Sequence, residues 1–255
     1  MVEKLTEKIS DEDKKISRRG LLVGAGKVAA GAAIVTAGMG LVSKAEASTS
    51  KYPWPYKKLD IDKVARIAYE NWFKNFCCYA VTSAILIPLR EKVGEPYTSF
   101  PLMSTKWGHG GAVGWGTLCG SLTGAGIVTG LCAGHDGENI LNEVIYWYAD
   151  TALPMYKPAN PKASIKSVNK SDSPLCHISV GKWMKKEGVK FFSPQRKDRC
   201  ARLSADVAVQ TVKFLNAWAD GKFKPTHKFP LFGYGITAQN NCTECHGSDI
   251  PQPLR

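Results

Sequence analysis

The segment Lys197–Asp220 reads KDRCARLSADVAVQTVKFLNAWAD and carries the clearest helical pattern in the chain. Its apolar side chains recur at helical spacing, at Cys200, Leu203, Val207, Val212, Leu215 and Trp218. This spacing predicts a long amphipathic helix whose apolar face lies on a core. Few segments alternate with period two over a useful length. The sequence therefore predicts an all-α fold, a compact helical domain.

Two other segments show related patterns. Asp60–Lys92 is one long helical pattern, with Asp60 or Asp62 as its N-cap and Pro88 as the point where it breaks. Ile140–Leu153 reads as an amphipathic helix rich in Tyr and Trp. Both add to the helical prediction.

A different pattern covers Gly110–Gly134, which contains no charged residue. Such a run must be weighed as a transmembrane helix, but its many glycines make it poorly hydrophobic. Small residues at four-residue spacing let a helix or a flat cofactor approach the backbone closely. We therefore expect a buried, tightly packed helix here. A shorter helix is predicted from Cys176 to about Gly188, after a Pro/Lys/Ser-rich loop.

The composition restricts the class of protein. The chain has 255 residues, 44% of them hydrophobic, which excludes a disordered chain, a collagen-like fibre and a coiled coil. The net charge of +12 suggests an acidic partner, which we expect to be a redox protein rather than a nucleic acid. Eight cysteines against five histidines suggest thiols that are paired or bound to a cofactor.

The first 47 residues resemble a twin-arginine export signal. Ser17–Leu22 reads SRRGLL, a weakly hydrophobic run follows from Val23 to Val42, and Ala45–Ala47 is a small-residue cleavage site. A membrane-anchoring helix is the alternative, but Lys27 and the many small residues weaken it. We therefore predict export to the periplasm, with no integral membrane span after cleavage. The mature chain would comprise a cysteine-rich helical domain over residues 48–220 and a haem segment over residues 221–255.

The motif Cys242-Thr243-Glu244-Cys245-His246 has the C-x-x-C-H spacing of c-type haem attachment. Two cysteines three residues apart reach both vinyl groups of one porphyrin edge, and the adjacent His246 then faces the iron. A zinc half-site or a disulfide hairpin is the alternative. Glycines and prolines around the motif predict a loop-rich tail that packs on the helical core. We assign Cys242 and Cys245 as the covalent anchors and His246 as an axial ligand.

The opposite axial position has several candidates. No methionine of the mature chain lies in an obvious ligand loop, so bis-His coordination is favoured. The available residues are His109, His135, His177 and His227, or a histidine from a second subunit.

Four blocks of sequence resemble the C-GCAxxG-C-C family of redox proteins. They are FCCYAV at residues 76–81, GGAVGWGTLCG at 110–120, Leu175–His177 and Arg199–Ala201. Together with the export signal and the haem motif, they resemble the split-Soret family of c-type cytochromes. The resemblance extends over roughly Tyr52–His246. It implies a helical homodimer with two bis-His haems per subunit near one end, and an iron–sulfur centre.

The family's cysteines correspond to Cys78, Cys119, Cys176 and Cys200, which would hold a [2Fe–2S] or [4Fe–4S] cluster, with [2Fe–2S] the expected type. The chain departs from the family pattern at Gly111, where the family has a cysteine, and at Trp115, where it has a glycine. Cys77 or Cys132 could therefore substitute in space. Buried free thiols or two disulfides are the alternative.

The number of haems is a second departure, because the chain contains one C-x-x-C-H motif where the resemblance implies two haems. Cys176-His177 retains half of such a motif, and attachment there would compete with the cluster for Cys176. His177 is the first candidate for a further axial ligand, ahead of His109.

The resulting hypothesis is a periplasmic electron-transfer protein that uses c-type haem and an iron–sulfur centre. It is a carrier rather than a catalyst, because no Ser-His-Asp or phosphate-loop pattern appears. The alternative is a haem oxidoreductase that acts on a small molecule such as nitrite or peroxide. A third interpretation is a structural scaffold with empty cysteines.

Overall fold

The computed structural model describes residues 51–227 and 243–248, and these residues are helical, with isolated β-bridges but no strands. The α-helices are α3 (Ile61–Val93), α4 (Gly120–Ala133), α5 (Asp136–Asp150), α6 (Cys176–Glu187), α7 (Pro194–Ala219) and α8 (Thr243–His246). Two short 3-10 helices, η1 (Tyr97–Ser99) and η2 (Leu102–Thr105), follow α3. The all-α prediction is therefore confirmed for this part of the chain. The predicted signal peptide and Cys242 lie outside the described residues.

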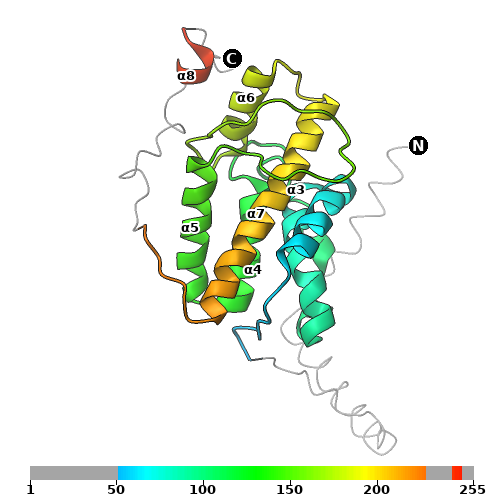
Figure 1. Cartoon of the computed structure of the whole chain (residues 1–255), viewed down its shortest axis with the longest axis vertical. Helices are drawn as coiled ribbons and strands as arrows, with labels where there is room; N and C mark the ends of the chain where they lie inside the picture. Colours follow the sequence, from blue (N-terminus) through cyan, green and yellow to red (C-terminus); the bar gives the residue numbers. More distant parts are fainter. Residues whose placement is uncertain (1–50, 228–242, 249–255) are drawn as a thin grey trace, which may run out of the picture. The chain divides into compact units, whose positions relative to one another are not determined.

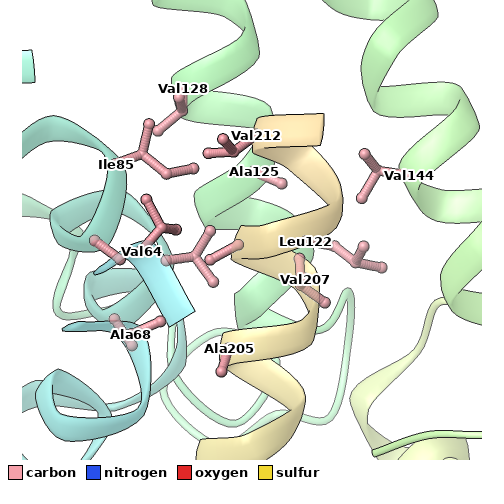
Figure 2. Packing of buried hydrophobic residues seen from close by; sticks show 14 of the residues in the cluster. Val64, Ala68, Ile85, Leu122, Ala125, Val128, Val144, Ala205, Val207 and Val212 are labelled. Atoms are coloured by element: carbon pink, nitrogen blue, oxygen red, sulfur yellow. The ribbon is translucent and has the colours of Figure 1, made fainter. Parts of the chain in front are cut away.

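The core lies between α3, α4, α5 and α7 (Figure 1). α7 packs against the other three helices, as its apolar stripe predicts. Figure 2 shows Val64 and Ile85 of α3 facing Val207 and Val212 of α7, with Leu122 of α4 close by. Pro194 occupies the first turn of α7, after the N-cap Ser193.

Helix α3 begins as predicted but breaks at a different place. The Asp60 side chain caps it by accepting the Lys63 N–H at 2.8 Å. The predicted break at Pro88 is wrong, because the proline lies inside the helix with its ring buried. The backbone instead leaves helical geometry at Asn75 (φ −142°) and Phe76 (φ 64°). This kink immediately precedes Cys77.

Only the second part of Gly110–Gly134 is helical. Positive φ angles at residues 110–114 and at Gly116 keep the first part in a loop. Helix α4 then packs very closely on α3. A Cβ atom on Gly124 would lie 2.7 Å from the Cys78 carbonyl oxygen, and one on Gly120 would lie 2.9 Å from the Cys77 Cβ. The prediction of a buried, tightly packed helix is therefore correct for residues 120–133.

Helix α3 is also long and apolar enough to cross a membrane. Most of its apolar stretch is buried inside the protein against the other helices. A buried core helix accounts for this composition.

The chain that leaves α7 is fastened to α5 through Glu143. The carboxylate accepts the backbone N–H groups of Thr226 and His227 at 2.6 and 2.7 Å, and its second oxygen lies 2.8 Å from His227 Nδ1. These hydrogen bonds hold the start of the predicted 221–255 segment on the helical domain.

Candidate functional site

Four thiols from four different parts of the fold share one buried region. Cys77 follows the kink in α3, Cys119 is the N-cap residue of α4, Cys176 begins α6, and Cys200 lies in α7. Cys77 is in electrostatic range of Cys200 and Cys119, and Cys176 is in range of the other three. All four are free thiols, so neither disulfide of the alternative hypothesis is present.

A short antiparallel pairing brings Cys119 next to Cys176. The bridge forms between Leu118 and Leu175. The Cys119 N–H donates to the Pro174 carbonyl at 2.9 Å, and the Cys176 N–H donates to the Thr117 carbonyl at 2.7 Å. The backbone thus fixes two of the four thiols before any ligand binds.

Burial keeps two of these thiols, Cys77 and Cys176, protonated in the metal-free protein. It raises the pKa of Cys77 to about 12, and charges on Cys200 and Cys119 raise it further. Burial also raises the pKa of Cys176, with added repulsion from Cys119, Cys200 and Cys77. Metal ions and clusters bind thiolates, so occupation of this site would release protons.

Hydrogen-bond donors surround the sulfur atoms. Trp72 Nε1 donates to Cys77 Sγ at 3.2 Å, and Arg199 Nη1 lies 4.0 Å from Cys200 Sγ. Tyr148 is hydrogen-bonded to Ser179 at 2.8 Å and also interacts with Cys119. Donors directed at thiolates stabilise the charged form and tune the potential of bound iron.

The structure places Cys77, and not the predicted Cys78, beside the other three thiols. Cys78 is in electrostatic range of Cys119, and burial raises its pKa to about 11. A Cβ atom added to Gly108 would lie 3.0 Å from Cys78 Sγ, so the Cys78 side chain packs against this glycine. Cys132, the other substitute considered, is hydrogen-bonded to Tyr97 at 3.3 Å and does not join the group.

Within residues 51–227 and 243–248, no three His, Cys, Asp or Glu side chains converge tightly enough to bind a single metal ion. A cluster of several iron and sulfide ions is larger than one ion and takes its thiolates at wider spacing. Three buried thiols and the half-buried Cys176, with hydrogen-bond donors around them, therefore fit an anionic cluster better than a lone cation.

Two predicted haem ligands face each other at the edge of this region. The ring centroids of His177 and His246 are 6.3 Å apart, and the ring planes differ by 16°. At metal–nitrogen distances of about 2 Å, two imidazoles on opposite sides of one iron have centroids ~6 Å apart. The pair thus has the separation that bis-His haem ligation requires. Cys242, and the side chain of Cys245, lie outside the described residues.

A cavity of about 520 Å³ adjoins both groups and is mainly apolar. Its lining includes Cys77, Cys176, Cys200, His109, His177 and Phe192. The His109 ring lies 5.3 Å from that of Phe76. The size and apolar character suit an organic cofactor. Of the other histidines, His135 is exposed and His227 is bound to Glu143.

Arg199 is a feature of the site that sequence reasoning missed. The guanidinium is buried beside Cys200. A signal was present, because Arg199 precedes Leu203 and Val207 by four and eight residues and so lies on the apolar face of α7. A cation on a core-facing stripe indicates a buried anionic partner.

Comparisons with known proteins agree with these observations. A family model described as "Putative redox-active protein (C_GCAxxG_C_C)" matches residues 69–214. Split-Soret cytochrome c of Desulfovibrio desulfuricans is 35% identical over 251 residues, which cover 91% of this chain and 87% of the relative. A solved structure described as "A novel iron centre in the split-Soret cytochrome c from Desulfovibrio desulfuricans ATCC 27774" aligns with a TM-score of 0.67 at 32% identity. The alignment covers 79% of this chain and 86% of that one.

Proposed function

Because the chain belongs to the C_GCAxxG_C_C family of redox-active proteins, and to the same family as split-Soret cytochrome c, we propose that it carries electrons between a c-type haem and an iron–sulfur centre. The iron centre named for the related structure motivates the second cofactor. One observation carries the proposal: α6 begins with Cys176 in the thiol group and His177 in the imidazole pair.

Cys242 and Cys245 would hold the haem covalently, and His246 and His177 would bind its iron. When bound, it supplies a one-electron couple whose potential depends on these ligands. The protein's part is to hold two imidazoles 6.3 Å apart. A histidine on each side leaves no open position at the iron, which favours electron transfer over the alternative, catalysis on nitrite or peroxide.

The iron–sulfur centre is held by Cys77, Cys119, Cys176 and Cys200. Four thiolates match a [2Fe–2S] cluster, which supplies a second one-electron couple. Cys77, Cys119 and Cys200 are buried, and Trp72 donates to the Cys77 sulfur at 3.2 Å. The structural-scaffold interpretation does not explain why four thiols and several hydrogen-bond donors converge on one region.

Adjacency of Cys176 and His177 gives the electron a short path. One residue would bind the cluster and the next would bind the haem iron, so a single peptide bond joins the two centres. Cys176 then has no role in haem attachment. Any second haem, as the resemblance implies, would need another anchor.

A homodimer is proposed from the surface next to the cavity. The loop that borders it and the segment after α6 expose large apolar side chains: Trp107, Val113, Trp115, Phe191 and Phe192. Several large apolar side chains exposed beside a cavity are typical of interaction sites. A second copy of this chain would cover it and could supply an additional axial histidine.

The periplasm is the proposed location, on the basis of the twin-arginine motif. The proposed external partner is an acidic redox protein, attracted by the basic surface. Electron exchange with it should therefore slow as salt increases.

The cofactor content tests the proposal. Haem per chain is measured by pyridine haemochrome, together with non-haem iron and acid-labile sulfide. We expect covalent haem together with non-haem iron and sulfide in the amounts per chain that one [2Fe–2S] cluster contains, which are half those of a [4Fe–4S] cluster. A protein with haem but without non-haem iron would contradict the second cofactor.

Replacement of Cys242 and Cys245 by Ala should abolish covalent haem at that site. Stoichiometric covalent haem retained in the variant would disprove this attachment.

Cyanide and CO distinguish electron transfer from catalysis. Spectra unchanged by both ligands indicate a six-coordinate haem, whereas a rapidly formed CO complex would favour the oxidoreductase alternative.

A further inference from the structure

Arg199 is a buried cation that forms no ion pair with a carboxylate in the part of the chain that the structure describes. Its side chain is 1% exposed. Nη2 donates to the Ser179 carbonyl at 3.3 Å and to Ser179 Oγ at 2.8 Å, while Nη1 points to Cys200 Sγ at 4.0 Å. Nε has no hydrogen-bond partner in the described part of the chain. Leaving such a charge unpaired in the interior is costly.

The described ion pairs do not supply the missing charge. Asp198, adjacent in the sequence, pairs with Arg202 at 2.5 Å. Asp206 is buried and accepts the backbone N–H groups of Met155 and Tyr156, both at 2.8 Å. Neither carboxylate forms an ion pair with Arg199 among residues 51–227.

The guanidinium is nevertheless held firmly in place. α6 contributes Ser179 and the Trp183 ring, whose centroid lies 5.9 Å from the Arg199 Cζ atom. Tyr148 of α5 donates to the same Ser179 hydroxyl at 2.8 Å. Three helices thus position one cation, which indicates that its location matters.

The groups that face Arg199 are sources of negative charge when deprotonated. Burial alone would lower the pKa of Arg199, but interactions with Cys200, Tyr148 and Cys119 raise it. Burial strongly raises the pKa of Tyr148, so this phenol stays neutral. Asp206 is also in electrostatic range of Arg199, but the group that Arg199 Nη1 faces directly, at 4.0 Å, is the Cys200 sulfur, which carries negative charge when it binds a metal centre.

We propose that Arg199 is the fixed counter-charge of the iron centre on Cys77, Cys119, Cys176 and Cys200, and that it raises the reduction potential of that centre. This inference rests on the proposed function. Each electron taken up by the cluster adds negative charge, which a nearby cation stabilises in a low-dielectric interior. Arg199 is a positioning and tuning residue, because it acts on the ligands and does not itself bind iron.

The test uses the full-length, haem-loaded protein with Arg199→Met, which removes the charge and keeps a long apolar side chain. Arg199→Lys retains the charge. The matched control is Lys213→Gln, an exposed position of α7 about 20 Å along the helix from Cys200. The midpoint potential of the iron centre is measured by EPR-monitored titration, with the haem of the same molecule as internal reference.

We expect Arg199→Met to make reduction of the iron centre at least tenfold less favourable, which lowers its potential by about 59 mV for one electron. Arg199→Lys should recover much of this loss, and Lys213→Gln should change nothing. An unchanged potential in Arg199→Met with iron retained would overturn the inference. Wild-type protein without non-haem iron would instead contradict the proposed function.

A second measurement is needed if the Arg199→Met variant binds less iron than wild type. Urea unfolding is compared with and without iron in wild type and Arg199→Met. Without iron the cation is unmatched, so Arg199→Met should unfold at the same urea concentration as wild type or a higher one; with iron it should be the less stable protein. A variant that is unstable in both states would show that Arg199 is needed for the fold alone, which refutes the inference.

Discussion

Cys77 and Cys78 are adjacent in the chain, yet their thiols enter different surroundings. Cys77 receives the Trp72 N–H and lines the cavity with Cys176 and Cys200. Cys78 packs against the Gly108 backbone. The side chains of consecutive helical residues point about 100° apart. A sequence alignment that is wrong by one residue therefore assigns the ligand role to a cysteine that only packs.

Single replacements of the two cysteines test this difference. Cys77→Ala should lose most of the non-haem iron, because only three thiols remain. Cys78→Ala, the matched control with the same chemical change, should retain iron at the wild-type ratio to haem. The iron-to-haem ratio is the measurement, and the reverse pattern would assign the ligand role to Cys78.

At the level of the helix, the kink in α3 decides where Cys77 points. Phe76 has φ 64° and ψ −162°, a region that residues other than glycine rarely occupy. Backbone strain of this kind is found where surrounding structure holds it in place, often beside functional groups. The Trp72 ring, with its centroid 5.5 Å from that of Phe76, is one such neighbour.

At position 76, glycine should therefore be more stable than alanine, the reverse of their order inside a regular helix. Inside a helix, Ala is more stable than Gly by about 1 kcal/mol. Here we expect Phe76→Gly to be more stable than Phe76→Ala by ~1 kcal/mol, because both lack the ring and only Gly accepts the positive φ without strain. Urea unfolding of the two variants measures the difference. A more stable Ala variant would show that the kink is not retained.

Close packing of α4 on α3 makes a second prediction at this scale. Gly124→Ala would place a methyl group 2.7 Å from the Cys78 carbonyl oxygen and should lower the free energy of unfolding by about 1–3 kcal/mol. Gly130→Ala on the same helix meets nothing within 4 Å and should be stabilising by up to ~1 kcal/mol. Equal effects from both substitutions would contradict the contact.

For the whole molecule, buried thiols make stability depend on pH. Burial raises the pKa of Cys77 and Cys132 to about 12 and that of Cys78 to about 11, above the value of ~8.5 in an unfolded chain. Their contribution to stability is fully present below pH ~8.5. It is lost as the pH rises toward these raised values, because the unfolded state ionises first.

We therefore expect the iron-free protein, kept reduced, to lose stability steadily above pH ~8.5. Each such thiol contributes a slope of about 1.4 kcal/mol per pH unit. With the cluster bound, Cys77 no longer titrates and the slope should be smaller. Urea unfolding at several pH values measures this, and Cys132→Ala should reduce the slope in both forms. Identical slopes with and without iron would argue against thiolate ligation.

The helical fold and the general location of its helices could be predicted because they follow from local pattern. Three of the four converging cysteines were also predicted, from the resemblance. Prediction was poorest where a local rule competed with packing: Pro88 was expected to break α3, but it stays inside the helix with its ring buried. The actual kink at Asn75 and Phe76 carries no sequence signal of its own.

The sequence by itself determined the helical periodicity, the C-x-x-C-H motif and the family, because each depends on the identity and spacing of residues close together in the chain. Only the tertiary structure decided that Cys77 joins Cys119, Cys176 and Cys200, that His177 faces His246, and that Arg199 is buried with no ion pair among residues 51–227. These features depend on contacts between helices far apart in the chain. Their geometry is set by close packing and by the cost of burying charge, and neither is visible in any single segment.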